Sequence, residues 1–143
     1  MARPATALLM FLPYRHAEQR ILASVAAAGY DDITLAQARV MARIGPDGTR
    51  LTELAEAGQI TKQSAGFLVD QLERAGYVER VPDPRDARAR LVRIATRGRE
   101  AQAVARETEA VIEREWQRHL GRQRMAALRE ALESLREITD PWA

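Results

Sequence analysis

The sequence of 143 residues contains no cysteine, which excludes disulfides, thiolate metal sites and cysteine-based redox chemistry. It contains only two histidines, His16 and His119, which are too few and too far apart in sequence to suggest a metal site. We find no nucleophile–base pair, no metal-ligand spacing and no phosphate-binding loop. We therefore expect a protein that is not an enzyme, with no catalytic residues, no metal and no cofactor.

The sequence also lacks a long apolar run. A membrane-spanning helix needs about 20 apolar residues, and no segment approaches that length. The apolar stretch at residues 7–12 is short for a signal-peptide core and is not followed by a small-residue cleavage site. We expect a single-domain cytoplasmic protein without membrane contact, in which residues 7–12 form a packing segment.

Charge is distributed unevenly along the chain. Residues 74–99 contain eight arginines and three acidic residues, a local net charge of +5, whereas the rest of the chain carries −3. A basic segment on a mildly acidic body indicates a directed electrostatic surface.

Apolar residues recur at helical spacing in the first part of the chain. Pro13 suits the first turn of a helix that Gly29 ends, and residues 5–12 either extend this helix with a kink or pack separately. Thr34 is expected to cap a second helix. Thr52 and Thr61 are expected to cap two further helices that are separated by a tight turn. A short helix, a tight turn and a second helix predict a helix-turn-helix.

The periodicity then changes to that of strands. Residues 77–81 and 90–94 each alternate between apolar and polar side chains, and the segment 82–86 contains two prolines that favour a turn. Two short strands around an arginine-rich turn predict a hairpin, or wing, directly after the helix pair.

Two long helices are expected at the C-terminal end. Thr96 is expected to cap the first, which Gly121 ends, and the second has apolar residues at spacings typical of a coiled-coil seam. These seam residues are Met125, Leu128, Leu132, Leu135 and Ile138. Together with Leu8, Leu9, Phe11 and Leu12 they exceed what one small core needs, which favours a homodimer. The alternative is that both surfaces close only their own core.

Three stretches, in this order and spacing, resemble the MarR family of bacterial transcription regulators. They are residues 68–80 (LVDQLERAGYVER), 83–88 (DPRDAR) and 92–98 (VRIATRG). Ala87 departs from the family, which usually has arginine there. The resemblance implies a mainly α fold with a small β-hairpin wing. We expect one domain over residues 1–143, with a winged helix-turn-helix at 33–96 and dimerisation helices at 5–29 and 97–140.

The resemblance also implies a transcriptional regulator that binds a palindromic operator on double-stranded DNA, most simply a repressor released by a small ligand. A helix places its first turns in the major groove, and arginines on a hairpin suit the narrow minor groove. The expected DNA-binding residues are Thr61, Lys62, Gln63, Ser64, Gly66, Phe67, Arg85, Asp86, Arg88 and Arg90. Asp86 is expected to hold the Arg88 guanidinium. The alternatives are solvated helix residues and a solvated charged hairpin.

A small aromatic or anionic effector is a further expectation from the resemblance, bound between the dimer helices and the winged unit. A cation beside an aromatic ring suits a phenolic carboxylate. The candidates are Tyr14, His16, Arg20 and Trp116, with Met41 and His119 beside them. Trp116 is also suited to a core or dimer interface. A winged-helix module that binds proteins rather than specific DNA is the alternative function.

Overall fold

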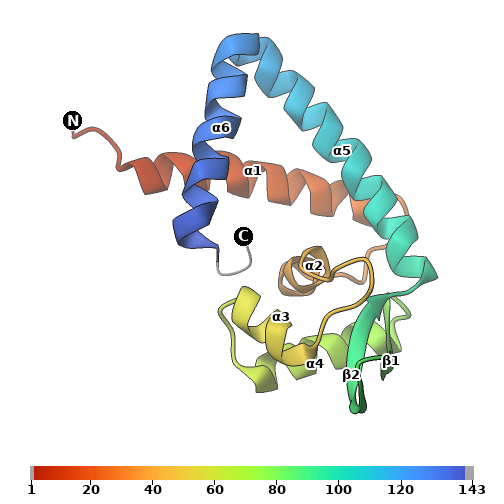
Figure 1. Cartoon of the computed structure of the whole chain (residues 1–143). Helices are drawn as coiled ribbons and strands as arrows, with labels where there is room; N and C mark the ends of the chain where they lie inside the picture. The colour runs from red at the N-terminus through yellow and green to blue at the C-terminus, as the bar shows by residue number, and fades with distance from the viewer. Residues whose placement is uncertain (1, 141–143) are drawn as a thin grey trace.

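A computed structural model describes residues 2–140 of the chain. Within these residues the chain forms six helices and one hairpin (Figure 1). In chain order they are α1 (Thr6–Ala27), α2 (Leu35–Ala42), α3 (Leu51–Ala57), α4 (Lys62–Arg74), β1 (Val78–Asp83), β2 (Asp86–Ile94), α5 (Thr96–Leu120) and α6 (Arg122–Thr139). Pro141, which the sequence places beyond the last helix, lies outside the described residues. The expected mainly α fold with a small hairpin is confirmed.

The elements fall into two groups (Figure 1). Helices α2, α3 and α4 lie with the hairpin at one end of the molecule, and we call this group the winged unit. Helices α1, α5 and α6 lie beside it, and the turn between α5 and α6 is at the opposite end from the hairpin (Figure 1). The long helices therefore form a support from which the winged unit projects.

Helix α1 differs from the simplest expectation, because Pro13 lies inside the helix rather than in its first turn. The second expectation, that residues before Pro13 extend the helix, is correct from Thr6 onward. Alanine, leucine and methionine dominate this segment, and they are strong helix formers. Their preference outweighs the one backbone hydrogen bond that the proline cannot donate.

Two of the four expected helix caps are confirmed and two are wrong. Thr34 and Thr61 accept the backbone N–H of the residue three positions on, at 3.2 and 3.0 Å. Thr52 lies within α3, because Arg50 is the N-cap residue and Glu53 accepts its N–H. Thr96 is the first residue of α5, after Ala95 as N-cap. At both sites the helix begins earlier than the sequence predicts, because each threonine is already inside the helix rather than at its N-cap.

The hairpin strands are longer than expected. β1 continues through Pro82 to Asp83, with an irregular register at that point, and the turn is reduced to Pro84 and Arg85. β1 is an edge strand, where a proline without an N–H is tolerated. Thr49 pairs with Val92 on the other side of β2 through two 2.9 Å backbone hydrogen bonds, which the sequence did not predict.

The core lies where α4, the hairpin and the start of α5 meet. Its fully buried side chains include Leu54, Val69, Leu72 and Tyr77. Leu68, which is partly buried, packs against this cluster. Because this stripe faces inward, the opposite side of α4 faces solvent.

Candidate nucleic-acid interface

The first turn of α4 presents a polar surface to solvent. Thr61, Lys62, Gln63 and Ser64 are all exposed. The Thr61 hydroxyl accepts the Ser64 N–H and donates to Ser64 Oγ at 2.9 Å, so it is already used as a cap. The Ser64 hydroxyl can therefore donate its proton to another acceptor, whereas the Thr61 hydroxyl already donates to Ser64 Oγ.

The next turn of α4 combines an open position with an exposed ring. A Cβ added at Gly66 would lie 3.6 Å from a Leu51 methyl, which is an ordinary contact, so packing within the chain does not require glycine there. Phe67 is 62% exposed, the second highest value among the large apolar residues that lie on the surface. A glycine beside an uncovered aromatic ring leaves a surface that a second molecule can approach closely.

Acidic residues on the far half of α4 are neutralised from the hairpin. Arg80 on β1 forms ion pairs with Asp70 at 2.8 Å and Glu73 at 2.9 Å. On the same hairpin, Arg93 binds Glu79 at 2.6 Å. These pairs leave the exposed surface of α4 and the hairpin with a net positive charge carried by other arginines.

Those other arginines are Arg85, Arg88 and Arg90, which are exposed at and beside the hairpin turn. Within residues 2–140, none of their guanidinium groups forms a hydrogen bond or ion pair. The expectation that Asp86 holds the Arg88 guanidinium is wrong, because Asp86 accepts the backbone N–H of Arg88 at 3.0 Å instead. The short turn places the carboxylate next to the backbone, and the Arg88 side chain remains free to bind an acceptor.

A buried carboxylate fixes the turn end of the hairpin. The Asp83 side chain is 4% exposed and accepts the Arg50 Nε–H and the Arg85 N–H, both at 2.9 Å. These hydrogen bonds, first that from Arg85 and then that from Arg50, lower the pKa of Asp83. Sequence reasoning missed Arg50 because it precedes Asp83 by 33 positions.

A second polar cluster joins α4 to α5. Arg97 donates to Ala75 O, at the end of α4, at 2.6 Å and forms an ion pair with Asp32 at 3.1 Å. Its guanidinium lies 4.3 Å from the centroid of the Tyr77 ring, and the Tyr77 hydroxyl donates to Asp32. That hydroxyl, followed by Arg97, lowers the pKa of Asp32, whereas burial and Asp32 raise the pKa of Tyr77. The cluster fixes the end of α4 relative to α5.

A cavity of about 1020 Å³ lies among α1, α2 and α5. Of the expected effector residues, Tyr14 and Met41 line it, but His16, Arg20, Trp116 and His119 do not. Arg20 instead binds Glu115, with a 3.1 Å bond from Nη2, which links α1 to α5. Of the four main effector candidates, this cavity therefore has only Tyr14 in its lining.

The Tyr14 hydroxyl donates to Glu18 at 2.7 Å, and Arg39 donates to the same carboxylate from Nε at 2.8 Å. Burial and the Glu18 bond raise the pKa of Tyr14, and the Arg39 bond lowers the pKa of Glu18. The lining of the cavity is mainly apolar, and Tyr14, Glu18 and Arg39 form a hydrogen-bonded polar group within it.

No helix in the part of the chain from residue 2 to residue 140 is both long and apolar enough to cross a membrane.

A short helix, a tight turn, an exposed second helix and a hairpin define a winged helix-turn-helix protein. The sequence model of the MarR family matches residues 31–89 of the chain. This match confirms the resemblance that the sequence motifs indicated.

Solved structures share the fold over nearly the whole chain. Wild-type MarR from E. coli, in its apo form, is 21% identical, with a TM-score of 0.71 and coverage of 94% of this chain and 98% of that one. The transcriptional regulator PA4135 is 25% identical, with a TM-score of 0.72 and coverage of 95% and 98%.

A curated relative is the exopolysaccharide II synthesis transcriptional activator ExpG of Rhizobium meliloti, which is 30% identical over 86 residues. That match covers 60% of this chain and 44% of the relative, so the chain matches less than half the length of that protein.

Proposed function

We propose that the protein is a dimeric, sequence-specific DNA-binding transcriptional regulator that binds a palindromic operator. The observation that carries the proposal is the combination of an exposed first half of α4 with three arginines on the adjacent hairpin whose side chains have no partner among residues 2–140. Cations that no carboxylate in the described part of the chain neutralises favour phosphate or minor-groove contacts.

The α4 residues divide by chemistry into base readers and phosphate contacts. Gln63 can form two hydrogen bonds to adenine, and the Phe67 ring can contact a thymine methyl. Lys62 and Ser64 suit phosphate oxygens. Gly66 leaves room for the duplex to approach α4 closely. Thr61 acts through the cap that orients this first turn.

On the hairpin, Arg88 is the residue we propose to enter the minor groove. Arg85 and Arg90 flank it and suit the phosphates on either side. Asp86 contributes by fixing the Arg88 backbone through its hydrogen bond. Its role is therefore to set the position of the hairpin turn rather than to contact DNA.

Two copies of the chain are required for useful affinity, because one helix and one hairpin make few contacts. Exposed apolar residues on α1 and α6 supply the surface for such a dimer. They are Leu8, Leu9, Met10, Phe11, Leu12, Leu128, Leu132, Leu135 and Ile138. In this proposal residues 5–29 and 97–140 form the dimer, and residues 33–96 of each copy contact half-sites about one helical turn apart.

Release of DNA by a small aromatic or anionic effector completes the proposal. The cavity is lined by five arginines and two glutamates, together with apolar side chains, which suits an organic anion. We propose a repressor. A reporter gene under the protein's own promoter shows whether the protein represses or activates. Deleting a repressor raises reporter expression, whereas deleting an activator lowers it.

Selection of bound duplexes from a random DNA pool tests the main proposal. We expect an enriched inverted repeat, with affinity that falls steeply as salt rises. Binding without preference over random duplex contradicts the proposal. If a protein partner is instead captured and then lost on Arg88→Ala, the alternative of a protein-binding winged helix is supported.

A further inference from the structure

Two arginines, Arg39 of α2 and Arg43 at its C-cap, are each bound by a carboxylate from outside the winged unit. Arg39 binds Glu18 of α1 through Nε at 2.8 Å and Nη2 at 2.9 Å. Arg43, one turn further, binds Asp140 at the end of α6 through Nη2 at 2.7 Å. Both carboxylate side chains are 13% exposed, so each is largely shielded from solvent.

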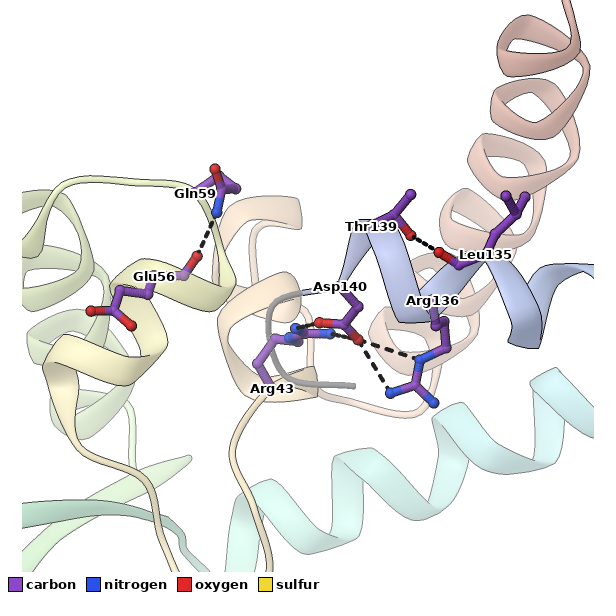
Figure 2. Close-up of polar contacts among 7 residues, drawn as sticks. All are labelled: Arg43, Glu56, Gln59, Leu135, Arg136, Thr139 and Asp140. Carbon is purple, nitrogen blue, oxygen red and sulfur yellow. Dashed lines mark hydrogen bonds and ion pairs between the residues drawn. The ribbon is translucent and has the colours of Figure 1, made fainter.

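The same arginines line the cavity among α1, α2 and α5. Arg43 also lines a smaller hollow of about 370 Å³, which it shares with Arg136 and Asp140 of the α6 segment. Figure 2 shows the side chains of Arg43 and Arg136 converging on Asp140. Arg43 therefore lies where the cavity and the end of α6 meet.

The two ion pairs differ in how easily the arginine can change partner. Glu18 receives two short bonds from Arg39 and a third from Tyr14. The Arg43 pair has one short bond and one of 3.4 Å. Asp140 also binds Arg136 at 3.2 Å, so it keeps a cationic partner when Arg43 leaves. Arg43 is thus the arginine that an anion in the cavity can recruit at lower free-energy cost.

We infer that Arg43 is a switch between Asp140 and the acidic group of an amphipathic organic anion in the cavity. With Asp140 bound, Arg43 holds the end of α6 against α2. Within residues 2–140, α6 reaches the winged unit by side-chain hydrogen bonds at Asp140 alone. When Arg43 binds the anion instead, the end of α6 is released and the winged unit loses this support. The effect on DNA rests on the proposed function, whereas the competition for Arg43 does not.

Calorimetry on the intact protein tests the competition without DNA, with 1-naphthoate as the probe and 1-naphthamide as its neutral counterpart. Asp140→Asn removes the competing carboxylate and is expected to tighten naphthoate binding about two- to five-fold, the range for an exposed ion pair. Arg43→Gln is expected to abolish the preference for naphthoate over naphthamide. Glu133→Gln is the matched control, because it removes one negative charge of α6 whose only ion pair among residues 2–140 is with Arg129 on the same helix.

Two results overturn the inference. One is equal naphthoate affinity in Asp140→Asn and Glu133→Gln, and the other is absence of naphthoate binding in every variant. Operator binding supplies a second readout: Asp140→Asn is expected to weaken it without ligand, and Glu133→Gln is not. If the wild-type protein shows no operator preference at all, the proposed function fails, but the calorimetric result still decides the switch.

Discussion

Replacing Arg88 by alanine gives the sharpest test of the hairpin. The guanidinium is exposed and has no partner among residues 2–140, so its removal takes nothing from the folded chain. A specific arginine contact to DNA contributes about 1–3 kcal/mol, which corresponds to about 5- to 150-fold in affinity for each half-site. We therefore expect a large loss of operator affinity with an unchanged melting temperature and an unchanged dimer.

Fluorescence anisotropy with a labelled operator duplex, measured at several salt concentrations, gives the affinity and its salt dependence. Arg122→Ala is the matched control, since Arg122 is equally exposed but lies at the start of α6, beyond the turn far from the hairpin (Figure 1). Arg122→Ala changes the net charge by the same amount. If both variants lose affinity equally, the effect is one of overall charge, and the role assigned to the hairpin is refuted.

Three further predictions concern packing, pH and assembly. Gly98→Ala places a Cβ 2.2 Å from Tyr77 O and should lower the free energy of unfolding by at least about 1–3 kcal/mol. Gly66→Ala should leave the free energy of unfolding unchanged or raise it. Urea denaturation measures both variants. The lowered pKa of Asp83 means that its ionised form stabilises the fold, so stability is complete above the unfolded carboxyl pKa of about 3.9 and falls as the pH drops through the folded value. Asp83→Asn should flatten that acid dependence in urea midpoints measured from pH 6 to pH 2. Leu132→Glu puts a charge on the proposed dimer surface and should yield monomers in sedimentation equilibrium, together with loss of operator binding; an intact dimer contradicts the assigned surface.

Local signals predicted the elements well, because each depends on a few neighbouring residues. Thr34 and Thr61 cap their helices, and Gly121 ends α5 with a positive φ of 86°, as the sequence indicated. The errors are also local. At Thr52 and Thr96 the helix begins earlier, and at Pro82 the strand continues because an edge position tolerates the missing N–H.

Contacts between distant segments could not be predicted from one sequence. Arg50 and Asp83 are separated by 33 positions, and Arg97 and Asp32 by 65. Nothing in the local pattern indicates which of many arginines meets which carboxylate, since that choice depends on how the helices pack. The same limit explains why Arg20, chosen as an effector residue, instead links α1 to α5 through Glu115.

The arginines of residues 74–99 separate into two groups once their partners are known. Arg80, Arg93 and Arg97 are bound by carboxylates, and they fix the hairpin and the end of α4. Arg99 is also held within the chain, by Ile94 O and Thr96 Oγ1, both at 3.0 Å. Among residues 2–140, the side chains of Arg74, Arg85, Arg88 and Arg90 have no such partner. The excess charge read from the sequence is therefore concentrated at the hairpin turn and the end of α4. Because the paired arginines fix the backbone, DNA binding has to order only the side chains of the unpaired ones, which lowers the entropic cost of binding an external anion such as DNA.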